Sequence, residues 1–402
     1  MELMTRENHF DAIVIGAGPA GSTAAYLLAK KGFKVLILDK KAFPRDKLCG
    51  GLLTWKTVKV LENIFQTSTD FLKSNQIILN QSSNYEVSHA NGASIRGRLE
   101  QPFYFVERSA YDFFWLKMAR QAGAVFRSGE KVTSLDPGKN QIVTSKGNQF
   151  SGSLVLGADG ALSRIRRSLS AKGFINPKSH SGLATALEVF VTHQQAPSLP
   201  DYPTIHFGHI PWGYAWCFPR ENLWLLGICG LNVKAAQLLK NGFKQFLKKI
   251  SVPVEHLSTA KSCALPYGNF LTQPGYKNIL LLGDACGLAD PLLGEGIYYA
   301  HKSAQLAAMA AVQSFGNPNK ALNLYRQSID ENILKELRYI RTGRQIFFSL
   351  PGAWPFKAVS SLLRTIPRIC EETIQGQRSF RWFRPVVKDN PKQSYSSTIK
   401  AG

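Results

Sequence analysis

The sequence lacks the features that mark membrane-spanning proteins and secreted, disulfide-rich proteins. Its 402 residues contain no uninterrupted apolar run of ~18 residues, the length that a transmembrane helix requires. Residues 1–11 carry several charged side chains and no apolar core, so no signal peptide is expected. The six cysteines are scattered without a Cys-x-x-Cys pair, which argues against a zinc site and a disulfide framework. We therefore expect a cytoplasmic protein with reduced thiols.

Acidic residues are also scarce, and the resulting charge indicates an anionic partner. The chain has 27 Asp and Glu against 49 Lys and Arg, a formal net charge of +22. An acidic lipid surface, a phosphorylated substrate or nucleic acid would each fit this surplus, and so would an ordinary solvated basic surface. Nucleic acid is not the expected partner, because the chain has no basic-aromatic RNA motif. The histidines do not cluster, so no metal is predicted.

The C-terminal part of the chain combines basic and aromatic residues. Residues 331–402 hold 13 Lys and Arg against 5 Asp and Glu. Aromatic side chains lie among them: Phe347, Phe348, Trp354, Phe356, Phe380, Trp382 and Phe383. This composition fits contact with a membrane surface, and it equally fits a packed helical tail with exposed lysines. Peripheral membrane contact is therefore a hypothesis.

A β-α-β unit opens the chain. Residues 12–15 form an apolar run typical of a buried parallel strand, residues 20–31 have the composition of a helix, and residues 34–39 form a second apolar strand. Asp39, followed by Lys40, ends this second strand at the position where a carboxylate accepts hydrogen bonds from ribose hydroxyls. The unit therefore predicts a dinucleotide site.

The turn between the first strand and the helix carries a G-x-G-x-x-G pattern, Gly16-Ala17-Gly18-Pro19-Ala20-Gly21. We expect Gly16 to make the tight turn, Gly18 to admit a pyrophosphate to the backbone, and Gly21 to let helix and strand pack closely. The helix N-terminus adds free N–H groups and the positive end of its dipole. This pattern alone does not distinguish FAD from NAD.

Two later glycine–aspartate motifs follow buried strands. Asp159 lies in the segment Gly157–Arg164, directly after a strand at 154–156. Asp284 follows the strand 278–282 and so lies at the carboxyl edge of the sheet, where ligands bind. The alternative is that these aspartates, or Ser163, only cap helices.

Glycines also open the long helix predicted at 294–314. Gly294 and Gly296 would allow backbone N–H groups to approach an electron-rich ring edge, and the helix dipole favours negative charge there. Because a reduced flavin is anionic at that edge, the segment favours a flavin. The alternative is a loop whose glycines serve only its own turns.

In this order and spacing, the three motifs resemble the FAD superfamily that includes aromatic hydroxylases, flavin halogenases and geranylgeranyl reductases. The resemblance covers about residues 10 to 310 and implies a noncovalently bound FAD. It implies that Asp284 binds the ribityl chain and that Gly296 and Ile297 approach the isoalloxazine. It also implies that Arg108 lies by the cofactor phosphates and that the Val132 backbone lies near the adenine.

Two further segments resemble signatures of the geranylgeranyl reductase family. One contains Cys49-Gly50-Gly51, which in that family lies close to the flavin, and the other, residues 211–219, reads P-x-x-Y-x-W-x-F-P. The second segment would border the site of a polyprenyl chain. We predict a catalytic or gating role for Cys49, and an inert small residue is the alternative.

The aromatic residues of the second segment alternate at strand period. Tyr214, Trp216 and Phe218 therefore share one face, which suits an apolar groove for an isoprenoid or a packed sheet core. Flavin halogenases carry W-x-W-x-I-P at a related place. Because Tyr214 stands for the first Trp and Phe218 for the Ile, a halogenase is disfavoured.

We predict an α/β fold in which Rossmann strands from both ends of the chain enclose an insertion. The FAD-binding domain is discontinuous and spans 1–65, 105–180 and 272–325. A mainly antiparallel β substrate domain spans 66–104 and 181–271. Residues 326–402 form a helical, basic C-terminal region.

The predicted function is reduction of carbon–carbon double bonds in a geranylgeranyl or polyprenyl chain by hydride from reduced FAD. The alternative is an FAD-dependent monooxygenase acting on an aromatic or isoprenoid substrate. The expected electron donor is transiently bound NAD(P)H or another low-potential donor such as a ferredoxin. No second G-x-G-x-x-G marks a site for a nicotinamide, so the sequence leaves the choice between these donors open. The expected partner is an isoprenoid or lipid. The headgroup, the proton donor and the oligomeric state stay open at this point.

Overall fold

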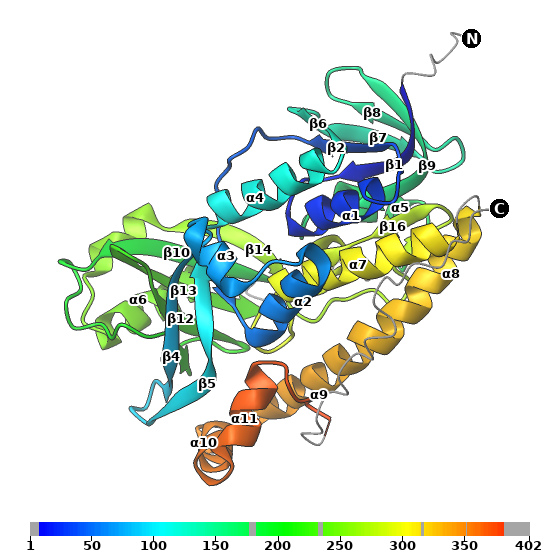
Figure 1. Ribbon diagram of the computed structural model, residues 1–402. Helices are drawn as coiled ribbons and strands as arrows, with labels where there is room; N and C mark the ends of the chain where they lie inside the picture. The colour runs from blue at the N-terminus through cyan, green and yellow to red at the C-terminus, as the bar shows by residue number, and fades with distance from the viewer. Residues whose placement is uncertain (1–7, 177–181, 232–235, 315–316, 351, 382–402) are drawn as a thin grey trace.

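Two β-sheets of eight strands each form the framework of the described chain (Figure 1). The structure is a computed structural model that describes residues 8–176, 182–231, 236–314, 317–350 and 352–381. In Figure 1 the first sheet and its helices occupy the upper right, and the second sheet lies to the left. A run of C-terminal helices extends from the first sheet down past the end of the second (Figure 1).

The first sheet has a parallel centre built from distant parts of the chain. Its parallel strands lie in the order β16, β9, β1, β2 and β6, with bounds Ile279–Leu281, Gln149–Gly157, His9–Ile15, Val35–Asp39 and Val125–Ser128. Antiparallel additions are β15 (Gly275–Tyr276) beside β16, and β7 (Val132–Asp136) with β8 (Gln141–Thr144) beside β9. Because the central strands are parallel, their carboxyl ends meet at one edge, where the three glycine motifs follow them.

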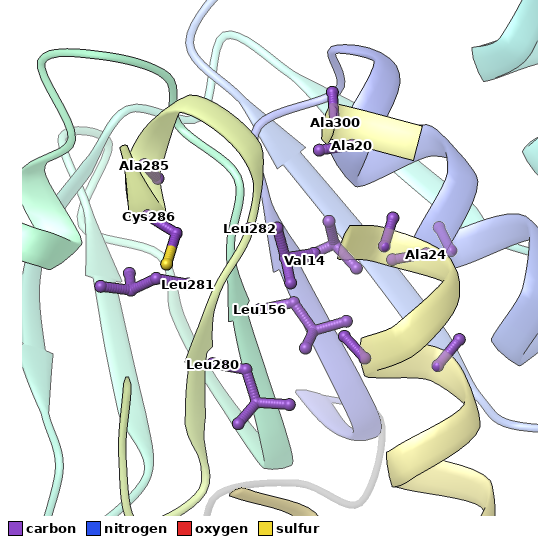
Figure 2. Packing of buried hydrophobic residues seen from close by; sticks show 14 of the residues in the cluster. Val14, Ala20, Ala24, Leu156, Leu280, Leu281, Leu282, Ala285, Cys286 and Ala300 are labelled. Atoms are coloured by element: carbon purple, nitrogen blue, oxygen red, sulfur yellow. The ribbon is translucent and has the colours of Figure 1, made fainter. Parts of the chain in front are cut away.

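Three helices cover one face of this sheet: α1 (Pro19–Ala29), α4 (Arg108–Gln121) and α7 (Ile297–Gln313), with α1 in contact with both others. Their small residues permit close packing. Figure 2 shows Ala20 and Ala24 of α1 beside Ala300 of α7, with Val14 and Leu156 of the sheet beneath them. All five side chains are buried, so this packing fixes where α1 and α7 begin relative to the strand ends.

A buried hydrogen-bonded cluster ties the same three helices together. In α7, His301 is fully buried, and its ring nitrogens lie 2.7 Å from the Thr23 hydroxyl of α1 and 2.8 Å from the Tyr111 hydroxyl of α4. Burial lowers the pKa of His301 to about 3. The ring is therefore neutral near pH 7, with one nitrogen donating and the other accepting.

The second sheet is antiparallel except where β11 pairs with β4 in parallel. In order it contains β14, β10, β13, β12, β11, β4, β5 and β3. Their bounds are Lys261–Pro266, Leu183–Thr192, Leu223–Leu231, Gly213–Pro219, Thr204–Phe207, Ile78–His89, Ser94–Val106 and Leu52–Leu53. The helix α6 (Ala236–Lys249) packs on one face over Val189 and Ile228, and the opposite face points toward the first sheet.

The C-terminal helices begin with a continuous rod. In it, α8 (Pro318–Ile329) passes through a π-helical turn, η5 (Asp330–Leu334), into α9 (Lys335–Ser349). The next helices, α10 (Trp354–Thr365) and α11 (Pro367–Ile374), contact β5 of the second sheet (Figure 1). In the ranges that the structure describes, no helix combines the length and apolar character needed to cross a membrane.

The remaining described elements are short. They are α2 (Trp55–Phe65), α3 (Thr69–Ser74), α5 (Arg164–Ala171), η3 (Val254–Thr259) and η4 (Gly283–Cys286). Of these, η4 lies directly after β16 and α5 directly after the segment that follows β9.

The predicted fold class is confirmed: the protein is α/β, with a discontinuous Rossmann-type part, an inserted mainly antiparallel sheet and C-terminal helices. One detail of the division differs. The short strand β3 lies inside the segment 1–65 assigned to the first domain, yet it pairs with β5 of the second sheet, Leu52 opposite Phe105. The chain therefore crosses to the second sheet soon after Cys49. Of the aromatic residues singled out in the C-terminal part, Trp382 and Phe383 lie outside the described residues.

Candidate active site

A cavity of about 910 Å³ lies between the two sheets. Every residue that the sequence analysis placed in the site lines it, except Gly21. The wall also includes residues that were not predicted, from β10, from α2 and from the C-terminal segment, where Ile374 and Phe380 close one side. The structure thus brings the three glycine motifs, the Cys49 loop and the aromatic strand together around one space.

The three glycines of the first motif have different surroundings. Gly16 has a φ of +103°, and a Cβ there would lie 2.3 Å from the Ala158 carbonyl oxygen. A Cβ on Gly21 would lie 1.8 Å from the Gly16 carbonyl oxygen, so Gly21 serves the helix–strand contact behind the cavity. Gly18 faces the cavity as the N-cap of α1, and Pro19 follows at the first helical position.

The N-terminus of α1 is open to an anion in the cavity. The described structure shows no side chain capping this helix end. Its first N–H groups are thus free, and the helix dipole makes this end positive. A side chain on Gly18 would meet only the Arg45 guanidinium, 3.5 Å from the Cβ, and would occupy this space itself. The arrangement fits a pyrophosphate.

At the carboxyl end of β2, Asp39 is held by two backbone amides. Its carboxylate accepts hydrogen bonds from the N–H groups of Ala17 and Lys41, each at 2.8 Å. Lys40 and, from β7, Val132 line the cavity beside it. These contacts orient the carboxylate and leave lone pairs for ribose hydroxyls.

An arginine pair shares one buried carboxylate near this helix end. Arg108, the first residue of α4, forms two hydrogen bonds to Asp112 at 2.9 and 3.0 Å, and Arg45 lies 3.2 Å from the same carboxylate. Burial alone lowers the pKa of Arg108, but the Asp112 carboxylate outweighs it and the net pKa is raised. Two guanidinium groups against one carboxylate leave a positive charge on the cavity wall, which suits phosphates.

The second motif combines both roles considered for it. Asp159 accepts hydrogen bonds from the Ser163 hydroxyl at 2.5 Å and the Arg164 amide at 2.7 Å, and Ser163 caps α5 by accepting from the Arg166 amide at 2.9 Å. Asp159 also lines the cavity, and burial raises its pKa. The helix-capping alternative therefore holds for this loop, and the capped loop forms part of the cavity wall.

The third motif forms the wall beside the glycine turn of α1, where a Cβ on Gly283 would lie 3.3 Å from the Ala20 side chain. Asp284 lies in η4, with its carboxylate 3.7 Å from the Lys47 ammonium, and η4 has no side-chain cap. Gly294 has a φ of +70°, and Gly296 is the N-cap of α7, directly before Ile297. The Gly294 amide donates to the Asp290 carbonyl at 3.0 Å, so the amides at the start of α7, from Gly296 onward, are the ones that a ligand could reach here.

The aromatic strand continues this wall. Along β12, Tyr214, Trp216 and Phe218 face the cavity, with neighbouring ring centroids 5.7 and 6.3 Å apart. Their rings are also buried in the core of the second sheet, so the groove and core alternatives both apply. The Tyr214 hydroxyl donates a short hydrogen bond to the Leu293 carbonyl, which joins this strand to the loop before Gly294.

The Cys49 loop runs close to the aromatic strand because its glycines leave room. A Cβ on Gly50 would lie 2.6 Å from the Phe218 ring, and a Cβ on Gly51 would lie 2.2 Å from the Val106 carbonyl oxygen. Cys49 is half-buried, and its sulfur accepts a hydrogen bond from the Gly51 amide at 3.3 Å.

Sequence reasoning missed Arg220, which holds this loop in place. Its guanidinium donates to the Gly50 and Val106 carbonyls, each at 2.7 Å. The residue directly follows β12, and burial lowers its pKa. No spacing in the sequence connects Arg220 with the Cys49 loop, so only the fold could reveal this contact.

Sequence reasoning also missed a charged cluster behind the α7 glycines. Glu295 accepts hydrogen bonds from the Thr54 and Thr57 hydroxyls at 2.5 and 3.1 Å and forms an ion pair with Lys56 at 2.6 Å. Burial lowers the pKa of Lys56, but Glu295 more than compensates, and the net pKa is well above its ordinary value. This cluster fixes the segment 294–297 against α2.

Glu188 of β10 is a further residue of the cavity that the sequence analysis did not predict. It lines the cavity with only 2% of its surface exposed, and burial raises its pKa to about 7. A signal for it did exist: it is a lone charged residue inside the apolar run 186–191.

The residues of the cavity fit FAD, and the sequence is similar to known FAD-binding proteins. Residues 9–206 match the FAD binding domain family. An uncharacterised protein of Methanosarcina barkeri is 31% identical over 301 residues, covering 74% of this chain and 73% of that protein. A geranylgeranyl diphosphate reductase of Rhodobacter capsulatus is 27% identical over 312 residues, covering 75% of each chain.

A solved structure shows the same fold. A geranylgeranyl bacteriochlorophyll reductase-like protein from Thermoplasma acidophilum has a TM-score of 0.75 and 20% identity, and the match covers 92% of this chain and 96% of that one. This likeness shows that the two chains share one fold. The chain belongs to the geranylgeranyl reductase family of FAD-dependent oxidoreductases.

Proposed function

We propose that the protein saturates carbon–carbon double bonds of a geranylgeranyl or other polyprenyl chain. The observation that carries the proposal is the continuity between the α7 glycine segment and the aromatic strand, joined by the hydrogen bond from Tyr214 to Leu293. A substrate lying along Tyr214, Trp216 and Phe218 would therefore lie beside the segment proposed to hold the flavin ring. An apolar, aromatic wall suits an isoprenoid, which has no polar atoms along its chain.

Eight of the predicted cofactor residues have a proposed part in holding FAD. Gly16, Gly18 and the α1 N-terminus would bind the diphosphate, with Arg108 nearby. Asp39 would bind the ribose and Val132 would border the adenine. Asp284 would bind the ribityl chain, and Gly296 and Ile297 would contact the ring. When bound and reduced, FAD supplies a hydride equivalent, and the protein residues orient the substrate and exclude water.

A second cavity offers room for the distal part of a long chain. It has a volume of about 240 Å³ and is lined by aromatic rings that include Phe347, Phe348 and Phe356. Phe207 lines both this cavity and the large one, so it forms the partition between them. A polyprenyl chain that passes Phe207 would leave the active site toward α9 and α10.

Those two helices support the proposed contact with a membrane surface. Ile346, Leu350 and Trp354 are exposed, the last at 72%, and they lie next to the second cavity. Lys357 lies over the Trp354 ring, 5.6 Å from its centroid. Apolar anchors beside a cation are typical of an interfacial helix on anionic lipid. We therefore propose that the protein is cytoplasmic and makes peripheral contact with a membrane surface.

Anaerobic turnover with a geranylgeranyl lipid tests the proposal. The FAD-loaded protein is reduced with dithionite, incubated with the lipid without oxygen, and the lipid is analysed by mass spectrometry. Stepwise gain of hydrogen pairs is expected. An unchanged lipid that gains oxygen once air and NADPH are supplied would instead identify a monooxygenase. Anaerobic bleaching of the flavin by NADPH, compared with a reduced ferredoxin, tests the proposed electron donor.

A further inference from the structure

Glu188 lies on the face of the second sheet that points into the cavity. Side chains alternate along β10, so Ala184, Ala186 and Glu188 share one face, whereas Leu187 and Val189 lie on the other face under α6. The carboxyl group therefore lies on the same cavity wall as the rings of Trp216 and Phe218.

Three cations and one backbone amide interact with the carboxyl group of Glu188. From the Cys49 loop, Lys47 and the Cys49 backbone amide interact with its carboxyl group; Arg108 faces it from α4 and Arg220 from the end of β12. The thiols of Cys229 and Cys263 lie on the neighbouring strands β13 and β14. These three cations favour the carboxylate, but burial outweighs them and holds the pKa at about 7.

One oxygen of Glu188 is unused by the protein. Its Oε2 is buried and has no hydrogen-bond partner among the described residues. A buried carboxyl oxygen without a partner is unfavourable and rare, and such groups concentrate where they act on a ligand. The geometry thus leaves an acid group that points into the cavity with a free oxygen.

Five other acidic groups of the cavity wall are engaged. Asp290 accepts hydrogen bonds from the Leu292 and Leu293 amides at 2.7 and 2.8 Å. Asp284 and Glu295 form ion pairs with Lys47 and Lys56. Asp39 accepts hydrogen bonds from two backbone amides, and Asp159 accepts one from the Arg164 amide. The Tyr214 hydroxyl is committed to the Leu293 carbonyl. Glu130 also lines the cavity and has a buried Oε2 without a partner among the described residues, but its amide donates to the Asp39 carbonyl at 2.8 Å, so it lies at the Asp39 end of the cavity. Burial alone raises the pKa of Glu130, but hydrogen bonds from its neighbours outweigh it and lower the pKa, which favours the carboxylate rather than the acid. Glu188 is therefore the acid group with an unengaged buried oxygen on the wall that carries Trp216 and Phe218.

We propose that Glu188 is the proton donor of the reduction, with Oε2 as the atom that carries the proton, an assignment that rests on the proposed function. The carbon–carbon π bond is consumed as two C–H bonds form. One carbon takes the hydride equivalent that reduced FAD supplies, and the other takes the proton as the O–H bond of Glu188 breaks. Lys47, Arg108 and Arg220 stabilise the resulting carboxylate, and water returns the proton before the next double bond is reduced.

A pair of conservative variants tests this assignment. Glu188→Gln keeps the shape of the side chain and removes the acid, whereas Glu188→Asp keeps the carboxyl group on a side chain that is one methylene group shorter. Glu221→Gln, an exposed residue of the turn after β12, is the matched control. In single turnovers of dithionite-reduced enzyme with the lipid, flavin reoxidation should slow by about 100-fold or more in Glu188→Gln and recover partly in Glu188→Asp.

Two further readouts separate proton donation from a structural role. FAD affinity and flavin reduction should be unchanged in Glu188→Gln, and the wild-type rate should fall as pH rises through about 7 while the variant rate stays level. In the protein without FAD, infrared titration should show a carboxylic acid band that disappears with the same midpoint and is absent from Glu188→Gln.

The outcomes distinguish this inference from the proposed function. If the wild type leaves the lipid unreduced, the proposed function fails and the role of Glu188 fails with it. If the wild type reduces the lipid and Glu188→Gln does so equally fast, only the Glu188 assignment is overturned. A full loss in Cys49→Ala with none in Glu188→Gln would move the proton to Cys49 and also overturn it.

Discussion

At the scale of single residues, the glycines of the first motif illustrate how one residue type serves different purposes. Gly16 and Gly21 are required by backbone contacts inside the protein, and both sites reject a Cβ. Gly18 has an ordinary negative φ and room for a methyl group. Its value lies in the space that it leaves for the ligand. Substitution should therefore separate folding from cofactor binding.

Gly18→Ala should fold as the wild type does but bind FAD at least about tenfold more weakly, because the methyl group occupies space proposed for the diphosphate. Gly21→Ala should instead lower the free energy of unfolding by ~1–3 kcal/mol, because its Cβ would overlap the Gly16 carbonyl. Thermal unfolding of the protein without FAD and flavin-fluorescence titration measure the two effects. Equal loss of FAD affinity in both variants would contradict this division.

Two histidines, the buried His301 and the half-buried His206, make the protein sensitive to acid. Burial lowers the pKa of His301 and of His206 to about 3 each, whereas unfolded histidine has a pKa of ~6.5. Below that value the unfolded chain binds protons that the folded chain does not bind. As the pH falls below that value, the free energy of unfolding should therefore decrease by up to ~1.4 kcal/mol per pH unit for each histidine.

Urea unfolding between pH 7 and pH 4 tests this dependence. His301→Gln should reduce the slope by the share of one histidine, whereas His193→Gln, at an exposed position, should leave it unchanged. A wild-type slope equal to that of His301→Gln would show that His301 is not the neutral, buried group described above.

Glu188 makes the free energy of unfolding depend on pH in the opposite direction. Its folded pKa is raised to about 7, while an unfolded glutamate has a pKa of ~4.3. Between these values the unfolded chain releases a proton that the folded chain keeps, so stability is lost as pH rises. Glu188→Gln should thus be more stable than the wild type at pH 8, by ~4 kcal/mol at most, and equally stable near pH 4. Urea unfolding at both pH values measures the difference, and no gain at pH 8 would argue against a protonated Glu188 in the fold.

At the scale of elements, α9 contributes to the active site although it lies far from it in sequence. Arg344 is buried and donates hydrogen bonds to the carbonyls of Tyr267 and Pro291. Its guanidinium also lies over the Tyr267 ring. Pro291 belongs to the loop that precedes Gly294, so α9 holds this loop from behind.

Arg344→Met should lower the free energy of unfolding by ~1–3 kcal/mol, because two buried carbonyls lose their donor. It should also increase hydrogen exchange in the loop 288–296. Lys335→Met, an exposed change on the same helix, is the control and should do neither. Unchanged exchange in Arg344→Met would show that α9 does not restrain the loop.

Two strands, β10 and β12, show what the alternation of side chains can predict and what it cannot. Alternation along β12 correctly places its three aromatic rings on one face. The same rule applied to β10 would have placed Glu188 beside them, because the two strands are joined through β13 in one sheet. Periodicity does not tell which face of a sheet meets the cavity, since both faces here are buried.

At the scale of the whole molecule, exposed apolar residues are concentrated where the C-terminal helices pass the second sheet. Trp354 and Ile346 are 72% and 60% exposed and lie near the second cavity. A membrane that covers this region would meet the proposed exit of the polyprenyl chain. The positive net charge of the molecule would add attraction to anionic lipid.

The double variant Trp354→Gln with Ile346→Gln should bind anionic vesicles at least about tenfold more weakly than the wild type, because two apolar side chains no longer enter the lipid. Phe71→Gln, an exposed aromatic of α3, is the control. Vesicle flotation measures binding. High salt should weaken the wild-type interaction if charge contributes, and salt-insensitive binding would contradict that part.

The sequence by itself determined the local elements and the cofactor-binding half of the site. The β-α-β unit, the glycine spacing and Asp39 are close together in sequence, and their geometry follows from backbone rules that act over a few residues. The helix predicted at 294–314 corresponds to α7 (Ile297–Gln313), because the glycines that precede it are local signals too. The family resemblance likewise depended on short, contiguous motifs.

Only the tertiary structure decided which distant residues complete the cavity. Arg220 meets the Cys49 loop, Lys56 meets Glu295, and Ile374 closes the wall, each across a long stretch of chain. Such contacts depend on how sheets and helices pack, and no spacing rule encodes them. The protonation of Glu188 is likewise a tertiary property, because burial between two sheets, and not the residue type, sets the energy of its charge.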